Sequence, residues 1–219
     1  MSRGAKISLA LVVVFVVAAT AILLVGRPDK DAEDGTAAGT PAVAAEVVRQ
    51  DSHRLSSAPQ GSPVFVEFLD FECEACRAVY PAIEELRAEY GDRVSFVVRY
   101  FPLPGHFNSE RAARAVEAAA QQGRLEQMYQ RMYETQTEWG EQRVPKDDVF
   151  RGYAVDLGLD MAAYDAAYAD PATAARVASD VADGEALGVQ GTPTFFLDGQ
   201  RFEPSTYQDL IDAFDAALD

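Results

Sequence analysis

The sequence has few residues that bind metals or form disulfide bonds. Its 219 residues include two cysteines, two histidines and one tryptophan. A structural zinc site takes four cysteine or histidine ligands. His53 and His106 each stand alone in their segments, so a zinc site built on the two cysteines is disfavoured. The chain can form one internal disulfide at most.

Positive charge is also scarce. There are 19 lysines and arginines against 35 aspartates and glutamates, which gives a net charge of −16 at pH 7. A protein this acidic is repelled by phosphate backbones and by anionic membrane surfaces. The composition therefore argues against a nucleic-acid partner and against docking on an anionic surface. The plain alternative is that the charge keeps the protein soluble.

Both cysteines lie in one C-x-x-C motif, Cys73 and Cys76. The apolar, β-branched and aromatic run 64–69 before the motif predicts a buried strand. A helical pattern follows and ends near Gly91. Its apolar positions recur at steps of mostly three and four residues: Cys76, Val79, Tyr80, Ile83, Leu86 and Tyr90.

This arrangement places Cys73 at the start of a helix. The free N–H groups and the dipole there stabilise a thiolate, which is the reactive form of cysteine. We expect Cys73 to be the exposed attacking sulfur and Cys76 the buried resolving sulfur. Two other interpretations remain: half of a metal site, or a structural disulfide, whose short loop would stabilise the fold by only about 2 kcal/mol.

Glu67 is a carboxylate in the middle of the predicted buried strand. An unpaired buried charge is costly, so such a group is either partly exposed or functional. The alternative to a functional role is that Glu67 faces solvent at a sheet edge or pairs with an arginine.

The rest of the chain predicts an α/β fold with a helical insertion. Residues 94–100 form a second buried strand, which a helix joins to the first, so the two strands should be parallel. Residues 106–187 look helical almost throughout, which is too long for one crossover helix. We therefore expect an inserted helical subdomain, with His106 at its start in a structural or hinge role.

The C-terminal part predicts a hairpin followed by a helix. Strands at 194–197 and 201–203 flank Asp198-Gly199, a typical type I′ turn. Ser205 with Gln208 is the expected capping box of the last helix.

The N-terminal part predicts a membrane anchor. Residues 7–25 are apolar and uncharged, long enough to span a bilayer, and a short basic flank precedes them. We expect residues 1–26 to be a transmembrane anchor, 27–50 a flexible linker and 51–219 the folded domain. A cleaved signal peptide is the alternative.

The C-x-x-C motif at a helix start, Pro81 in that helix and the late segment 191–196 together resemble the DsbA-like thiol–disulfide oxidoreductases. The resemblance covers roughly residues 52–219. It implies a thioredoxin fold, a central mixed sheet flanked by helices, with a helical subdomain inserted between its βαβ and ββα halves. No cofactor or metal is implied.

The same resemblance assigns further site residues. Glu67, six residues before Cys73, falls where the family carries a buried acid and would be the proton acceptor for Cys76. Pro193 would be a cis proline facing the C-x-x-C motif. The Thr192 backbone would pair with an extended substrate strand.

These observations predict a membrane-tethered, extracytoplasmic thiol–disulfide oxidoreductase that forms disulfides in unfolded or cysteine-containing exported proteins. The resemblance implies re-oxidation by a quinone-linked membrane oxidase. Glu74-Ala75 departs from the residues usual in the family, and the carboxylates of Glu72 and Glu74 beside Cys73 predict a weaker oxidant than the most oxidising members of the family. The alternatives are a reductase or isomerase, and a thioredoxin-like binding module without turnover.

Overall fold

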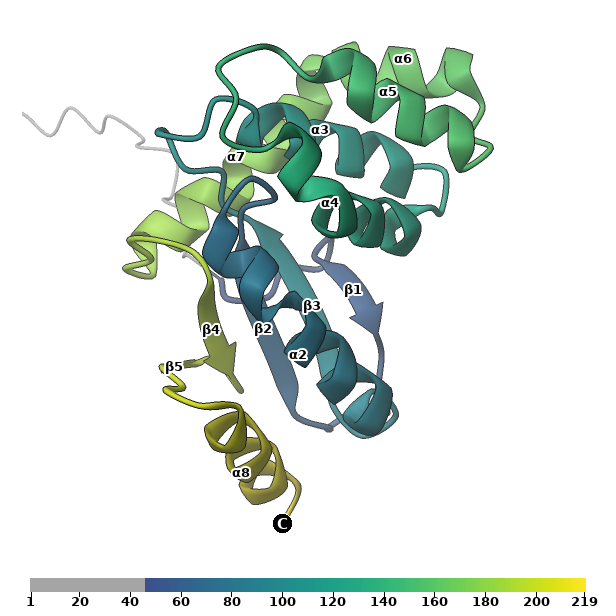
Figure 1. Ribbon diagram of the computed structural model, residues 1–219. Helices are drawn as coiled ribbons and strands as arrows, with labels where there is room; N and C mark the ends of the chain where they lie inside the picture. Colours follow the sequence, from purple (N-terminus) through teal and green to yellow (C-terminus); the bar gives the residue numbers. More distant parts are fainter. Residues whose placement is uncertain (1–45) are drawn as a thin grey trace, which may run out of the picture. The chain divides into compact units, whose positions relative to one another are not determined.

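The structure is a computed structural model that describes residues 46–219. A five-stranded sheet forms its centre, in the order β1-β3-β2-β4-β5 (Figure 1). The strands are β1 (His53–Ser56), β2 (Val64–Leu69), β3 (Ser95–Tyr100), β4 (Thr194–Leu197) and β5 (Gln200–Phe202). β2 and β3 are parallel and the other neighbours are antiparallel, so the sheet is mixed, as predicted.

Two helices cover one face of the sheet. α2 (Glu74–Tyr90) connects β2 to β3, and α8 (Tyr207–Leu218) packs against it through Tyr90 and Phe214, whose ring centroids are 5.4 Å apart. Phe214 of α8 anchors this layer, with its ring centroid 5.2 Å from that of Phe65 and 5.6 Å from that of Phe96. Side chains alternate along a strand, so Phe65, Glu67 and Leu69 of β2 all point towards this layer.

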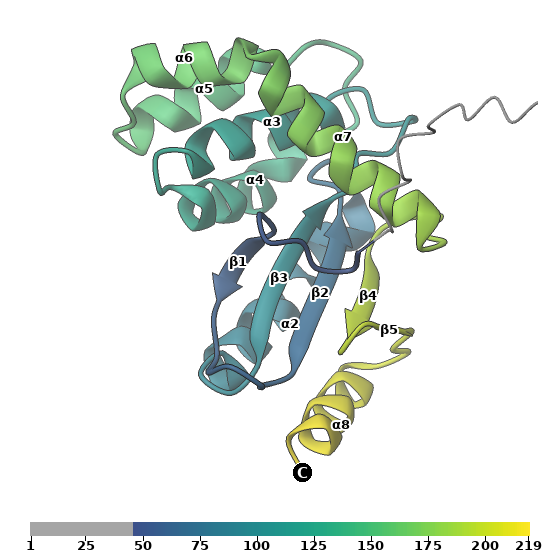
Figure 2. The ribbon, with the colours of Figure 1, turned by 180° about the vertical axis from the view of Figure 1, so that it is seen from behind.

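The opposite face packs against α7 (Pro171–Ala186), which lies on the near side of the sheet in Figure 2. Val66 and Phe68 of β2 belong to a second apolar cluster that includes Val181 of α7. Gly184 permits this close approach, because a Cβ atom there would lie 2.7 Å from the ring of Phe101. The sheet is therefore buried on both faces, which explains why β2 and β3 read as continuous apolar runs.

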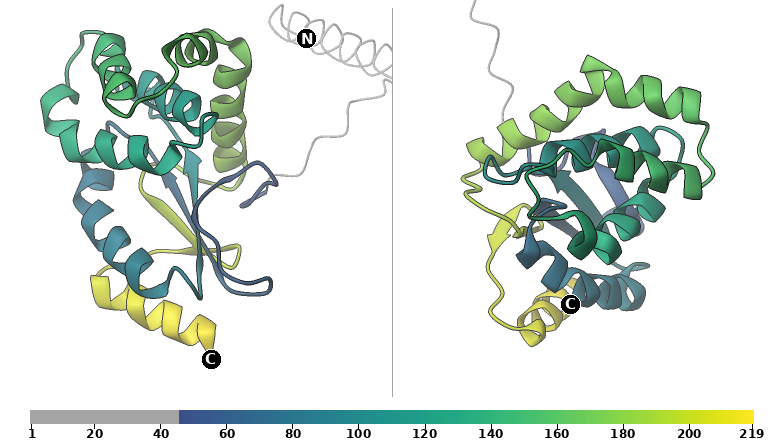
Figure 3. Two further views of the ribbon diagram at one scale, coloured as in Figure 1. Left: turned by 90° about the vertical axis from the view of Figure 1, so that its right-hand side faces the viewer. Right: turned by 45° about the horizontal axis from the view of Figure 1, so that its top comes forward.

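Five helices form the predicted insertion between the two halves of the sheet. They are α3 (Ser109–Ala120), α4 (Leu125–Trp139), α5 (Asp147–Asp156), α6 (Met161–Ala169) and α7. They gather at the end of the sheet where β2 and β3 finish (Figure 3). α3 contacts each of the other four, and its buried alanines allow them to approach closely.

A buried ion network joins the sheet to α7. Arg99 of β3 is fully buried and donates to Asp180 at 2.6 Å and to Asp183 at 2.5 Å. Arg49 also pairs with Asp183. Removing one partner of such a network leaves a buried charge uncompensated. The carbonyls of Glu46 and Val47, in the segment expected to be the linker, also accept hydrogen bonds from Arg99.

The last helix and the N-terminal segment differ in how far the structure describes them. The capping box of α8 is formed by Thr206 and Asp209, one residue beyond the predicted Ser205 and Gln208, because the Thr206 side chain accepts from the Asp209 N–H group. The predicted anchor at 1–26 lies outside the described residues. Within residues 46–219, no helix combines the length and the apolar character needed to cross a membrane.

Candidate active site

The C-x-x-C motif lies at the junction of β2 and α2. Cys73 is the N-terminal cap of α2 and Cys76 lies one turn into the helix. Gln136 of α4 fixes the backbone here, because its side-chain amide donates to the carbonyls of Phe71 at 2.7 Å and Cys73 at 2.9 Å. The helical insertion therefore holds the motif loop in place.

Both cysteines are free thiols in this structure, and their electrostatics differ strongly. A hydrogen bond from Cys76 and, to a smaller extent, the N–H groups at the start of α2 lower the pKa of Cys73 to about 5, although partial burial opposes them. Burial, the hydrogen bond to Cys73 and the charge of Glu67 raise the pKa of Cys76 well above its ordinary value. One thiolate and one thiol at neutral pH make the pair suitable for thiol–disulfide exchange.

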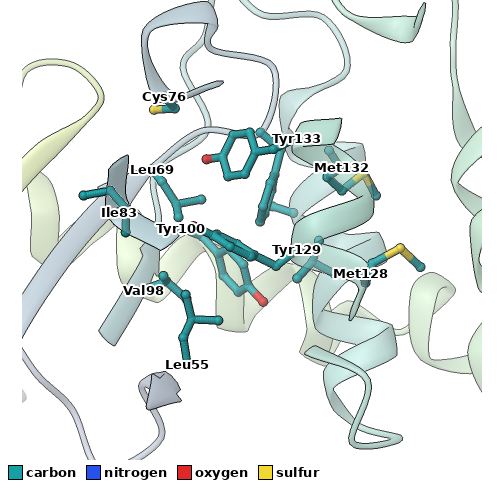
Figure 4. Packing of buried hydrophobic residues seen from close by; sticks show 14 of the residues in the cluster. Leu55, Leu69, Cys76, Ile83, Val98, Tyr100, Met128, Tyr129, Met132 and Tyr133 are labelled. Carbon is teal, nitrogen blue, oxygen red and sulfur yellow. The ribbon is translucent and has the colours of Figure 1, made fainter. Parts of the chain in front are cut away.

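The expected exposure of Cys73 is wrong. Its relative exposure is 7%, against 0% for Cys76. Its sulfur lies 3.3 Å from the carbonyl oxygen of Thr192, so the loop before β4 covers part of it. Cys76 is buried above an apolar cluster that includes Tyr129 and Tyr133 (Figure 4).

The loop before β4 brings Thr192 and Pro193 to the motif. The Thr192–Pro193 peptide bond is cis, as the resemblance implies. A groove of about 460 Å³ begins beside Pro193 and runs between α2 and the segment after β5. Its walls include Val79 of α2, Phe202 of β5 and Tyr207 of α8.

Glu67 lies on the central strand β2, between Val98 of β3 and Phe195 of β4. It is 3% exposed, and no salt bridge reaches it from residues 46–219. Burial, with smaller contributions from Glu84 and Cys73, raises its pKa to about 8. The structure thus excludes both alternatives, an exposed edge position and an arginine pair within the described residues. A carboxyl group that is mostly protonated at pH 7 lies close enough to Cys76 to affect its pKa.

Sequence analysis missed a second acidic residue near the motif, Asp70. Asp70 is 1% exposed, and its carboxylate accepts from the N–H groups of Glu72 at 2.8 Å and Leu103 at 2.9 Å and from His106 Nδ1 at 2.6 Å. Burial raises the pKa of Asp70 to about 6, although these hydrogen bonds act in the opposite direction. The available signal was an aspartate at the end of the predicted strand, three residues before Cys73.

Glu72 also has a structural role. Its buried carboxylate accepts from the N–H groups of Asn108 at 2.6 Å and Glu141 at 3.1 Å. The φ angle of Glu141 is 57°, in the left-handed region that non-glycine residues rarely adopt. The hydrogen bond to Glu72 helps to hold this turn, so the motif loop and the helical insertion fix each other.

Fold and site together define a thioredoxin-fold protein with a dithiol site opposite a cis proline. A family model described as Thioredoxin matches residues 54–216, and the chain belongs to this family. The sheet, its flanking helices and the insertion confirm the predicted fold class.

Curated relatives match over only part of their own length. The chain is 37% identical over 164 residues to Na(+)/H(+) antiporter NhaA 1 of Mycobacterium sp. (strain KMS), covering 72% of this chain and 25% of that protein. It is 38% identical over 144 residues to the Na(+)/H(+) antiporter NhaA of Herminiimonas arsenicoxydans, covering 64% of this chain and 21% of that protein. The chain thus spans about a quarter of the length of these relatives.

Solved structures of other proteins share this fold. A thioredoxin-like oxidoreductase from Silicibacter pomeroyi DSS-3 has a TM-score of 0.65 and 27% identity, covering 77% of this chain and 93% of that one. The alpha-DsbA1 of Wolbachia pipientis has a TM-score of 0.65 and 17% identity, covering 78% of this chain and 93% of that one. MdbA from Corynebacterium diphtheriae, a thiol–disulfide oxidoreductase, has a TM-score of 0.61 and 17% identity, covering 72% of this chain and 85% of that one. The last two support the fold alone.

Proposed function

We propose that this protein is an extracytoplasmic thiol–disulfide oxidoreductase that transfers a Cys73–Cys76 disulfide to exported proteins. The observation that carries the proposal is the contrast between the two sulfurs. The pKa of Cys73 is lowered to about 5 at the start of α2, and that of Cys76 is raised by burial. A stabilised Cys73 thiolate favours the reduced enzyme, and an enzyme that favours its reduced form oxidises its substrates.

The reaction balances without a cofactor. A substrate thiolate attacks the Cys73 sulfur of the enzyme disulfide, and the bond to Cys76 breaks. Cys76 leaves as a thiolate and takes a proton from Glu67, whose pKa of about 8 makes it a proton donor at neutral pH. The second substrate thiolate then attacks the substrate sulfur of the mixed disulfide, and Cys73 leaves as a thiolate. Two electrons pass from the substrate to the enzyme, and Glu67 regains a proton from solvent, as its pKa of about 8 in the reduced protein requires. On re-oxidation Glu67 releases that proton to solvent and then accepts the proton of Cys76.

The loop before β4 is the proposed substrate platform. The Thr192 backbone would pair with an extended substrate segment, and Pro193 would hold that segment beside Cys73. The groove of about 460 Å³ continues from Pro193 and offers apolar walls to side chains that flank the substrate cysteine. Backbone pairing and a broad groove suit a varied set of unfolded substrates.

The cellular setting is part of the proposal. The apolar segment 7–25 supports a single membrane anchor, with the N-terminus in the cytoplasm and the catalytic domain outside. Two cysteines, both in the motif, suit an oxidising compartment where spare thiols are hazardous. A quinone-linked membrane oxidase is the proposed source of oxidising equivalents. The relatives named as antiporters support a place for such domains at a membrane.

Trapping of mixed disulfides in cells tests the proposal. Cys76→Ser leaves Cys73 able to bond to substrates but removes the intramolecular attack that releases them, so high-mass adducts sensitive to reductant should accumulate. Cys73→Ser removes the bonding sulfur and should give none. The reverse pattern would refute the assigned roles.

A second candidate rests on the 7% exposure of Cys73. A thioredoxin-like binding module would hold partner chains and need no accessible sulfur. Absence of adducts with both variants, together with failure of the native protein to react with a maleimide, would favour this function.

A further inference from the structure

The pair formed by Asp70 and His106 has no part in the reaction described above. We propose that the Asp70–His106 pair positions a protonated imidazole near Cys73, which stabilises the Cys73 thiolate and couples the redox state of the site to pH. The inference rests on the proposed function, since it concerns the redox potential of the same pair, Cys73 and Cys76. It assigns to His106 an electrostatic role instead of the structural or hinge role expected from the sequence.

The histidine is held rigidly. Its Nδ1 lies 2.6 Å from Asp70, and its backbone N–H donates to the Leu103 carbonyl at 3.0 Å. The hydroxyl of Ser109, at the start of α3, donates to the His106 carbonyl at 3.2 Å. The imidazole is about one quarter exposed, with a side-chain exposure of 23%, so it can exchange protons with solvent while Asp70 at 0% cannot.

Asp70 connects this imidazole to the motif. Its carbonyl accepts the Cys73 N–H at 3.1 Å, and its carboxylate accepts the Glu72 N–H at 2.8 Å. The carboxylate therefore fixes the turn that presents Cys73 and the ring of His106 at the same time. Neither Glu74 nor Ala75, the residues between the cysteines, can supply a positive charge to the thiolate.

The surroundings of His106 favour its charged form. Burial lowers its pKa, but the hydrogen bond and charge of Asp70, followed by the charges of Cys73 and Glu72, outweigh it and raise the pKa above its ordinary value. The charged groups around His106, from the motif loop, α3, the segment after α4 and α7, are Asp70, Glu72, Glu110, Arg111, Glu141, Arg143 and Glu185. Five of these seven are acidic.

The pH window follows from the two groups. The pKa of Cys73 is about 5, and the pKa of His106 is raised above 6.5. The Cys73 thiolate and the His106 imidazolium therefore coexist from about pH 5 up to the raised pKa of His106. Above the pKa of His106 the imidazole becomes neutral and the thiolate loses its partner, so the oxidising power should fall. The coupling is reciprocal, because a charge on Cys73 must raise the pKa of His106 as much as imidazolium lowers that of Cys73.

The chain offers a matched control in its other histidine. His53 also pairs with a carboxylate, its Nε2 lying 2.5 Å from Glu117, but that carboxylate belongs to α3 and not to the motif loop. His106→Asn places a neutral amide donor where Nδ1 meets Asp70, so it removes the charge and keeps the hydrogen bond. His53→Asn is the corresponding change away from the motif.

Two measurements on the full-length protein test the inference. Ultraviolet titration of the reduced protein should give a Cys73 pKa that is higher by a few tenths in His106→Asn, because one nearby positive charge is lost, and unchanged in His53→Asn. NMR titration of the unmutated full-length protein should give a His106 pKa that is higher in the reduced than in the oxidised form by a similar amount, with the His53 pKa unchanged.

An equal His106 pKa in both redox states would overturn the inference even if the variant failed to fold. So would an unchanged Cys73 pKa in a folded His106→Asn. Both experiments need only a disulfide that forms and reduces reversibly with dithiothreitol. Failure of that reversible step would count against the proposed function instead.

Discussion

Replacing Glu67 by glutamine should stabilise the protein in a way that depends on pH. Burial raises the pKa of this carboxyl group from 4.5 to about 8 in the folded reduced protein. The folded state therefore keeps the proton through a range in which the unfolded state has lost it. Below pH 4.5 the carboxyl group is neutral in both states and has no effect on stability. As pH rises towards 8, stability is lost.

The size of the effect follows from the two pKa values. One pH unit corresponds to about 1.4 kcal/mol, so the loss is about 3 kcal/mol at pH 7 and approaches about 5 kcal/mol above pH 8. Glutamine matches the shape of the neutral acid and cannot ionise. Glu67→Gln should therefore match the original protein at pH 4 and exceed its free energy of unfolding by several kcal/mol at pH 8.

Urea unfolding of the reduced proteins at several pH values provides the assay. The cysteines titrate in both proteins, so the difference between the two isolates Glu67. Glu89→Gln, on the exposed surface of α2, is the control and should change stability by less than about 0.5 kcal/mol at every pH. A difference between Glu67→Gln and the original protein that is independent of pH would refute the buried, protonated carboxyl group. In exchange assays the same variant should react more slowly, because Cys76 loses its proton donor and acceptor.

Three further predictions concern the surroundings of Cys73. Gln136→Leu removes two hydrogen bonds to buried carbonyls and should lower the free energy of unfolding by about 1–3 kcal/mol in urea titrations. Pro193→Thr should change the lifetime of the mixed disulfides trapped by Cys76→Ser, as measured by their decay on non-reducing gels. Glu74→Gln removes a negative charge next to Cys73 and should lower the Cys73 pKa by at most about 0.5 in ultraviolet titration; a higher pKa would contradict this.

Local patterns were enough to predict the elements that carry the motif. A few neighbouring residues suffice to predict each of three elements: the β-branched strand 64–69, the helix after Cys73 and the Asp198-Gly199 turn. The structure has all three. Asp198 and Gly199 have φ angles of 48° and 77°, as a type I′ turn requires. The sequence left open whether Glu67 is buried or faces solvent, and the structure buries it.

Contacts between distant segments could not be predicted in the same way. Asp70 and His106 are 36 residues apart, and their contact depends on how the chain turns after β3. Gln136 reaches the motif from α4, 63 residues beyond Cys73, because the insertion packs over the end of the sheet. The low exposure of Cys73 has the same origin, since Thr192 covers it from the other half of the fold. Periodicity identifies the buried face of an element but not the element that will cover it.

The reduction potential of the Cys73–Cys76 pair tests the central claim most directly. Thioredoxin, with a nucleophilic cysteine pKa of roughly 7, has a potential of roughly −270 mV. A pKa of about 5 stabilises the reduced form at pH 7 by roughly a further 2.3 kcal/mol, which corresponds to about 50 mV. Equilibration of the protein with glutathione buffers should therefore give a reduction potential of roughly −220 mV for the Cys73–Cys76 pair. A value at or below roughly −270 mV would contradict the account and indicate a reductase.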